Sequence, residues 1–202
     1  MKKGFPLLLQ EVHACRVCEV ELPLGPRPIL QLHPKASILI VGQAPGRKVH
    51  ETGIPFNDPS GDRLREWLGV SREIFYDAKK IAILPMGFCY PGTGKSGDFP
   101  PRPECAATWR ATLLAQLPKI KLTLVIGQYA HNYHIHDFSY TTVTETVKAW
   151  REFWPERLPL PHPSPRNNRW LTRNPWFAVE LLPALRKQVQ AVLKANQVGK
   201  SG

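Results

Sequence analysis

Short apolar runs rich in β-branched residues recur at four places along the chain. They span residues 37–42, 80–85, 122–127 and 158–161. Each run is short and uninterrupted, as is typical of strands that helices cover on both faces. The pattern therefore predicts four buried parallel strands.

Segments with helical periodicity lie between these runs. Leu64, Trp67 and Leu68 share one face after a Ser-Gly-Asp start, and three further residues, Trp109, Leu113 and Leu117, repeat every four positions. The same spacing returns near the end of the chain, at Phe177, Leu181, Leu185, Val189 and Leu193. Asn174 and Pro175 predict the start of that last helix, and Pro183 predicts a kink or a split in it. Alternating strands and helices indicate a three-layer α/β/α sandwich with a central four-stranded parallel sheet.

The length of 202 residues suits one domain, and neither an internal repeat nor a linker divides the chain. We expect residues 1–30 to form an N-terminal segment of that domain and residues 196–202 to be a frayed tail. No apolar run approaches the ~20 residues that span a bilayer. The apolar run near the N-terminus is too short for a signal peptide and lacks a cleavage site. We expect a cytoplasmic monomer without membrane attachment.

The formal net charge of +11 is spread along the chain, which favours a folded surface that binds a polyanion. Nucleic acid is the favoured partner, and a basic protein without such a partner is the alternative.

Two loops follow predicted strands. Gly42-Gln43-Ala44-Pro45-Gly46 predicts a tight turn whose N–H groups could hold an anion or a carbonyl oxygen, although a purely structural turn has the same composition. His162 starts the second loop, where Pro163 and Pro165 keep the backbone extended. Because ligands bind at the carboxyl ends of parallel strands, these two loops are candidates for a site.

Together with Gly53-Ile54-Pro55-Phe56, these motifs form an ordered set over roughly residues 10 to 190. The set resembles the motifs of uracil-DNA glycosylases, and most closely those of the iron–sulfur branch called family 4. The resemblance implies a DNA partner and a nucleotide flipped out of the stack. The N-glycosidic bond of uracil or of another deaminated base would then be hydrolysed.

The resemblance also implies residue roles. His162 would donate a hydrogen bond to the carbonyl oxygen of the flipped base, and Phe56 would stack on that base. The pocket would be lined by Gly42, Gln43 and Ala44. Residues expected to contact DNA are Ser164, Arg166, Asn167, Arg169 and Lys95, with Arg166 where related enzymes insert a leucine and Lys95 in a flexible loop over residues 91–103. The alternatives are a structural role for His162, a core role for Phe56, a solvated loop for the run of Arg and Asn from Arg166, and a solvated linker for residues 91–103.

Two positions depart from the family pattern. Family 4 carries Glu where this chain has Gln43, and a neutral amide cannot act as a base. The nearest replacements are Glu51, Asp58 and Asp62. Pro85 stands about where the family has an Asn that reads the edge of uracil, so the base preference could differ. A non-catalytic DNA-binding or damage-sensing protein on the same fold is therefore the second hypothesis, and an iron–sulfur redox protein is a third.

The four cysteines are Cys15, Cys18, Cys89 and Cys105. The resemblance to family 4 implies a [4Fe–4S] cluster, for which four thiolates are the usual complement. Zinc sites with four cysteines more often use two close pairs, and disulfides are not expected in a cytosolic protein. Zinc and four unliganded thiols are the alternatives.

Overall fold

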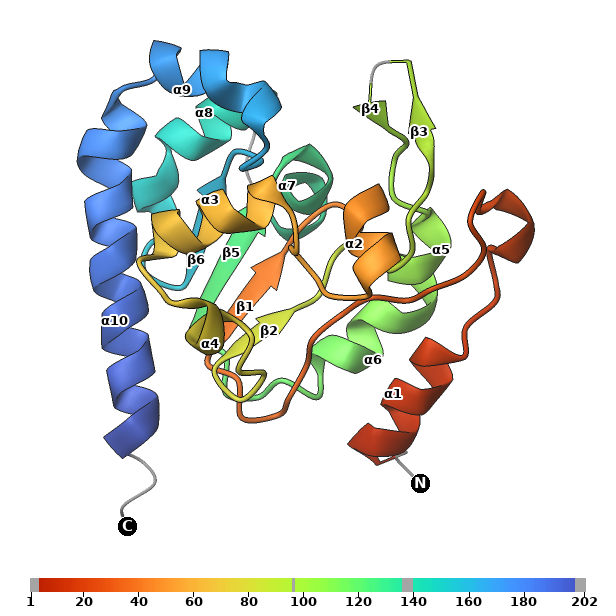
Figure 1. The fold of residues 1–202 in the computed structure, drawn as a ribbon. Helices are drawn as coiled ribbons and strands as arrows, with labels where there is room; N and C mark the ends of the chain where they lie inside the picture. Colours follow the sequence, from red (N-terminus) through yellow and green to blue (C-terminus); the bar gives the residue numbers. More distant parts are fainter. Residues whose placement is uncertain (1–3, 96, 136–139, 199–202) are drawn as a thin grey trace.

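The computed structural model describes residues 4–95, 97–135 and 140–198. Its centre is a parallel sheet of four strands in the order β2-β1-β5-β6 (Figure 1). The strands are β1 (Ile38–Val41), β2 (Ile81–Ile83), β5 (Leu122–Ile126) and β6 (Arg157–Leu160). All four predicted strands and the predicted fold class are confirmed.

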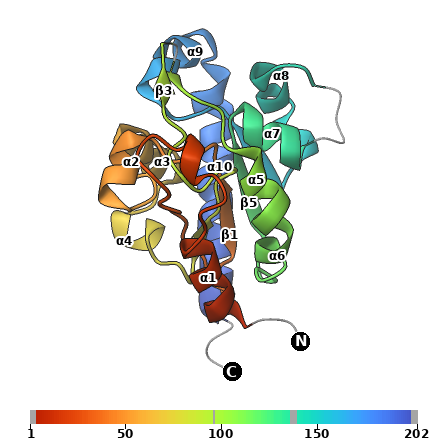
Figure 2. The same ribbon diagram turned by 90° about the vertical axis from the view of Figure 1, so that its right-hand side faces the viewer.

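Successive residues of each strand face opposite sides of the sheet, and this alternation divides the core in two. Ile38 and Ile40 of β1 pack into a cluster with α3 (Pro59–Leu68) and α10 (Leu182–Val198). Leu39 and Val41 pack into a second cluster with α1 (Phe5–His13) and α6 (Ala111–Leu114). Figure 2 shows helices on both sides of the sheet, which is the expected three-layer arrangement.

The remaining helices connect these layers. They are α2 (Arg47–Thr52), α4 (Arg72–Phe75), α5 (Pro103–Cys105), α7 (Gln128–His134), α8 (Val143–Lys148) and α9 (Asn168–Arg173). Two π-helical turns, Ala106–Arg110 and Phe177–Leu181, precede α6 and α10. Short 3-10 turns occupy Glu19–Glu21, Trp150–Glu152 and Pro165–Asn167.

Two of the three helical periodicities are also confirmed, and in the middle one Leu113 is buried in α6 while Leu117 lies beyond the end of that helix. The face predicted on α3 is buried, and so are all five residues of the last periodic segment. Pro183 does not end that last helix. It lacks the N–H that would bond to the carbonyl of Val179, and the turn that contains Val179 is the π-helix before α10.

Two expectations are wrong. Residues 91–103 are not a plain loop, because β3 (Thr93–Gly94) and β4 (Gly97–Asp98) form an antiparallel hairpin there. The tail does not begin at residue 196, because α10 continues to Val198. The Asn196 amide donates to Ser37 Oγ at 3.3 Å, which fixes the helix to the start of β1. Residues 199–202 lie outside the described part. Among the described residues, no helix is long and apolar enough to cross a membrane.

Candidate active site

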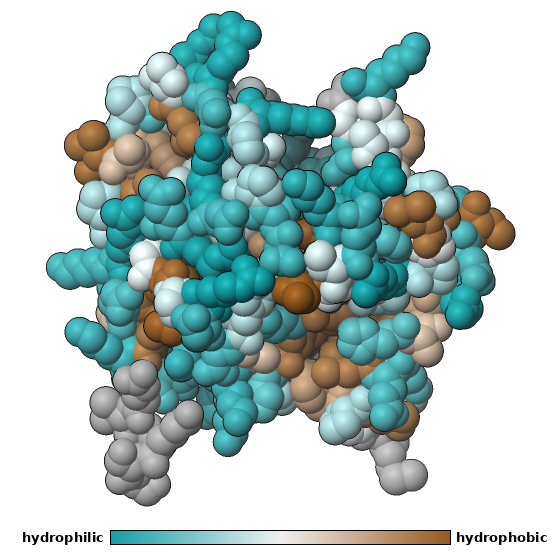
Figure 3. Space-filling model, viewed as in Figure 1, coloured by the Kyte–Doolittle hydropathy of each residue, from teal (hydrophilic) through white to brown (hydrophobic). Residues whose placement is uncertain are grey.

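A cavity of about 520 Å³ lies at the carboxyl edge of the sheet. Its walls come from the loop after β1, the segment around Phe56, the end of β2, the β3–β4 hairpin and the loop after β6. In Figure 3 a notch separates the upper left and upper right of the molecule, where Figure 1 places α9 and the hairpin. The structure therefore brings both predicted loops to one cavity.

The glycine-rich loop is held as an extension of the sheet. The Met86 N–H donates to the Gly42 carbonyl at 2.8 Å, and the Gly87 N–H donates to the Gln43 carbonyl at 2.9 Å. A Cβ at Gly42 would lie 3.4 Å from the Phe56 ring, so this position brings the aromatic ring against the main chain. Gly42, Gln43 and Ala44 all line the cavity, as predicted.

Phe56 lines the cavity and has an unusual backbone conformation. Its φ of 54° lies in the left-handed region, which costs a residue with a side chain about 1–3 kcal/mol. The Phe56 carbonyl accepts hydrogen bonds from the Tyr76 hydroxyl at 3.2 Å and from Arg65 Nη1 at 3.3 Å. Gly61 lies directly against the same carbonyl, where a Cβ would be only 1.7 Å from the oxygen. Tyr76, Arg65 and Gly61 thus fix the Phe56 carbonyl and, through the backbone, the position of the ring. The sequence alone did not predict these three contacts.

His162 is held as a neutral donor. The Ser164 N–H donates to His162 Nδ1 at 3.2 Å, so Nδ1 carries no proton and the neutral ring bears its hydrogen on Nε2. Burial lowers the pKa of His162, against a smaller opposing effect from the carboxylates of Asp58 and Asp98. No atom of the described residues hydrogen-bonds Nε2, and the ring lines the cavity. At neutral pH the side chain therefore offers an N–H group to a ligand.

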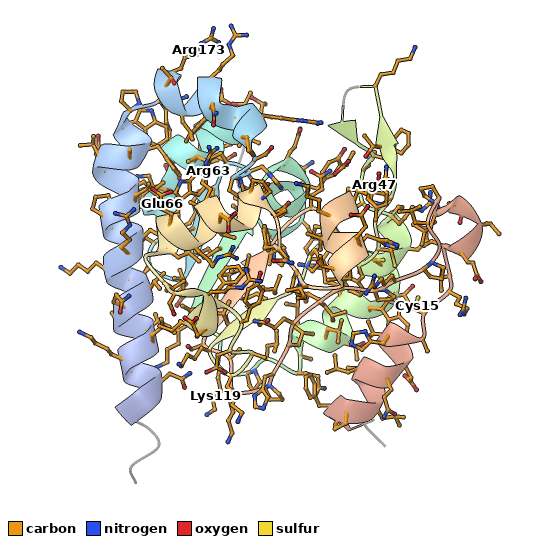
Figure 4. All side chains as sticks on the ribbon, in the orientation of Figure 1. Cys15, Arg47, Arg63, Glu66, Lys119 and Arg173 are labelled. Atoms are coloured by element: carbon orange, nitrogen blue, oxygen red, sulfur yellow. The ribbon has the colours of Figure 1, made fainter. Side chains whose placement is uncertain are left out.

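The loop that carries His162 is fastened to α3. Figure 4 labels Arg63 on α3. Arg63 Nη1 donates to the Ser164 carbonyl at 3.1 Å, and Arg63 Nη2 donates to Asn168 Oδ1 at 2.8 Å. The Asn167 amide donates to the His162 carbonyl at 2.7 Å. Arg63 was not singled out from the sequence, because nothing in its neighbourhood along the chain indicates a partner about one hundred residues away.

Three of the five residues predicted to contact DNA line the cavity, and two lie outside it. Ser164, Arg166 and Asn167 line the cavity, and the Arg166 guanidinium lies against Gly97 of the hairpin. Lys95 and Arg169 are exposed and lie outside the cavity lining, on the turn of the hairpin and on α9.

The residues match one family over most of the chain. Residues 31–186 match the model of the uracil DNA glycosylase superfamily. The chain belongs to this superfamily. A candidate uracil DNA glycosylase from Methanosarcina acetivorans, solved by solution NMR, is 18% identical and has a TM-score of 0.47. That match covers 80% of this chain and 97% of the other.

Of the three carboxylates suggested from the sequence of this superfamily member, only Asp58 lines the cavity. Glu51 lies outside the cavity and forms an exposed ion pair with Arg47 at 3.1 Å. Asp62 also lies outside, paired with Arg65. Asp58 does line the cavity, and its Oδ1 accepts from the Gly61 N–H at 2.9 Å as the N-cap of α3. A second carboxylate, Asp98 of β4, lines the cavity from the hairpin and was missed.

Pro85, at the position where the superfamily pattern suggested an Asn, lines the cavity. Arg110 lies behind it, fully buried, and donates to the Pro85 carbonyl at 2.9 Å and to the Leu84 carbonyl at 3.3 Å. Burial lowers the pKa of Arg110 to about 10. Among the described residues no carboxylate forms an ion pair with this guanidinium, so its charge is held by carbonyls and by His134 Nε2.

The four cysteines line one small cavity away from the candidate active site, together with Phe88 and Arg102. None of the four forms a disulfide. The Trp109 indole donates to Cys15 Sγ at 3.4 Å. Burial raises the pKa of Cys18, and it raises those of Cys89 and Cys105 to about 11. Figure 4 places Cys15 in the segment after α1.

The described residues contain no group of three or more His, Cys, Asp or Glu side chains placed to hold a metal ion. A single zinc ion needs its sulfur ligands about 2.3 Å from one common centre. Four cysteine thiolates are a donor set that a zinc ion and a [4Fe–4S] cluster both use, and here the four thiols surround one small cavity.

Proposed function

We propose that the protein is a DNA glycosylase that hydrolyses the N-glycosidic bond of uracil or of another deaminated base. The observation that carries this proposal is the position of His162. Its Nε2–H group is available in the same cavity as the Phe56 ring and the glycine-rich loop. Superfamily membership supports the same class of reaction.

The chemistry follows from charge development. When the bond between base and sugar breaks, the base takes the electron pair and becomes anionic while the sugar becomes cationic. The His162 Nε2–H would donate to a carbonyl oxygen of the departing base. A donor already held in place costs no reorganisation during the reaction. The burial that lowers the pKa of His162 keeps the ring neutral, so its N–H is available at physiological pH.

The same cavity would hold the base before it leaves. Phe56 would stack on the flipped base, and Gly42, Gln43 and Ala44 would surround it. Pro85 offers no donor to a base edge, and its carbonyl already accepts from Arg110. The position of Pro85 therefore supplies no Asn side chain to select uracil, and other deaminated bases belong among the substrates to be tested.

DNA would lie across the mouth of this cavity. Ser164, Arg166 and Asn167 stand at the cavity, and the more distant Arg169 and Lys95 would contact phosphates. The net charge of +11 supports a polyanionic partner.

The cysteine cavity would hold a [4Fe–4S] cluster through Cys15, Cys18, Cys89 and Cys105. Four thiols around one cavity match the donor set, since each iron takes one thiolate. When bound, such a cluster would supply a structural crosslink between the N-terminal segment and the segment after β2. The Trp109 indole and the Arg102 guanidinium would remain beside the sulfur atoms as donors.

The test is base release from oligonucleotides that contain one uracil, hypoxanthine, xanthine or ethenocytosine, read by alkaline cleavage at abasic sites. We expect His162→Ala to lower the single-turnover rate by about 10²–10³-fold, as the loss of one preorganised donor does. His33→Ala is a matched control. His33 also precedes a proline and accepts from a backbone N–H two residues on, at 3.0 Å, but it lies outside the cavity.

A His162→Ala protein that retains the wild-type rate would contradict this assignment. The missing motif carboxylate favours a second candidate, a non-catalytic DNA-binding or damage-sensing protein. Salt-sensitive DNA binding without release of any base from the four substrates would favour that candidate.

A further inference from the structure

The glycine-rich loop carries no carboxylate, yet the Asp98 carboxylate lies beside Gly46, the last residue of that loop. We propose that Asp98, presented by the β3–β4 hairpin, is the carboxylate that takes a proton from the attacking water. This inference rests on the proposed glycosylase function and adds the group that the family motif lacks.

The position of Asp98 is the first support. Asp98 lines the cavity from the hairpin, opposite the loop that starts at Gly42. Its Oδ2 lies 3.5 Å from the point that a Cβ on Gly46 would occupy. The carboxylate therefore reaches across to the last residue of the Gly42-Gln43-Ala44-Pro45-Gly46 motif, in which Gln43 is neutral.

The orientation of the carboxylate is the second support. Asp98 pairs with Thr93 across the hairpin, and the Thr93 hydroxyl donates to Asp98 Oδ1. Thr93 Oγ1 also lies 2.6 Å from the hydroxyl of the buried Tyr90. This chain of hydroxyls fixes one oxygen of the carboxylate and leaves Oδ2 toward Gly46. Asp98 is exposed at the mouth of the cavity, and the hydrogen bond from Thr93 holds its carboxylate in one orientation, as a general base requires.

Asp58, the other carboxylate in the cavity, is engaged differently. Its Oδ1 accepts from the Gly61 N–H as the N-cap of α3, so it stabilises a helix start. The charges of both Asp58 and Asp98 oppose the lowered pKa of His162, which places both carboxylates within electrostatic reach of the ring. At the two glycines of the loop, Asp98 is the carboxylate found within 4 Å of a Cβ position, on Gly46.

The backbone of the β3–β4 hairpin positions the Asp98 side chain at the cavity. Gly97, directly before Asp98, has a φ of 136°, a backbone conformation that favours glycine. The absence of a side chain at Gly97 also lets the Arg166 guanidinium pack against the hairpin. The hairpin and the His162 loop therefore meet over the cavity and bring acceptor and donor together.

The reaction balances with these groups. The C1′–N bond breaks and its electron pair leaves with the base, while His162 Nε2–H stabilises the base oxygen. Water adds to the electron-poor C1′ and forms the new C–O bond. The proton lost by that water goes to the Asp98 carboxylate and then to solvent or to the base anion. The products are an abasic site and the free, protonated base.

The experiment is single-turnover base release by Asp98→Asn, with Asp77→Asn as the matched control. Asn can still accept from Thr93, and Asp77 lies near the start of β2, away from the cavity. We expect Asp98→Asn to slow release by about 10²-fold or more, with DNA affinity unchanged. Asp77→Asn should keep the wild-type rate. Asp98→Glu, which keeps the charge and displaces it, should give an intermediate rate.

The outcomes separate the two proposals. If the wild-type protein releases base and Asp98→Asn does so at the same rate, the role of Asp98 is overturned while the glycosylase function stands. A large loss in Asp58→Asn together with none in Asp98→Asn would transfer the role to Asp58. If the wild-type protein releases no base at all, the glycosylase function itself is wrong. Urea denaturation of each variant shows whether a lost rate reflects a lost fold.

Discussion

Gly61→Ala reverses the usual effect of its substitution type. In the first turn of a helix, Gly to Ala ordinarily stabilises by about 0.5–1 kcal/mol, because Ala has the higher helix propensity. Here the new Cβ would lie 1.7 Å from the Phe56 carbonyl oxygen, whereas real Cβ atoms keep at least 3.0 Å from such neighbours. The oxygen must retreat by about 1.3 Å. It cannot do so freely, since Tyr76 and Arg65 both donate to it.

We expect Gly61→Ala to lower the free energy of unfolding by about 1–3 kcal/mol, the range of overpacked sites. The Phe56 ring moves with its peptide, and a displacement of about 1 Å can cost a catalytic site about 10²-fold in rate. Urea denaturation measures the first effect and single-turnover base release the second. Gly4→Ala is the control, because a Cβ there meets only Pro6 Cδ at 3.9 Å. A Gly61→Ala protein as stable as the wild type would refute the reasoning about the Phe56 backbone.

Two further predictions concern titration and the cysteines. His131 is buried, and burial lowers its pKa from 6.5 to about 4. The free energy of unfolding therefore has its full value above pH 6.5, and the part that depends on neutral His131 is lost as the pH falls from 6.5 through 4. Urea denaturation should show about 3 kcal/mol of stability lost over this interval that His131→Gln does not lose, and equal losses in both proteins would contradict the assignment. For the cysteines, anaerobically purified protein should be brown and contain four irons per chain, while Cys89→Ser should lose the visible absorbance. One zinc per chain and no iron would identify the site as a zinc site instead.

The strands and the large helices were predictable because the spacing of apolar residues within a short segment indicates which of its side chains are buried. A run such as residues 37–42 has few conformations that hide all its side chains, and the spacing of Leu64, Trp67 and Leu68 fits only a helix. The two loops at strand ends were found because glycine, proline and histidine restrict the backbone in recognisable ways. The cavity that joins them follows from the parallel sheet.

The missed residues depend on contacts between distant parts of the chain. Asp98 lies in a segment of glycines and polar residues without hydrophobic periodicity, and each strand of its hairpin has only two residues. Arg110 acts on Leu84 and Pro85 from a helical turn about twenty-five residues away. No pattern in the neighbouring sequence predicts the hairpin that carries Asp98 or the hydrogen bonds of Arg110. Glu51 shows the converse, because closeness along the chain suggested a site residue that the fold directs to Arg47 instead.

The cavity is assembled from segments that the ribosome synthesises at different times. In the described part of the chain, β6 is the last strand and lies at the edge of the sheet, where it pairs with β5 alone. The glycine-rich loop and Phe56 are synthesised more than one hundred residues before His162. Until β6 and the loop after it have been synthesised, the cavity has no histidine. The site closes only when the final third of the chain emerges and β6 joins the sheet.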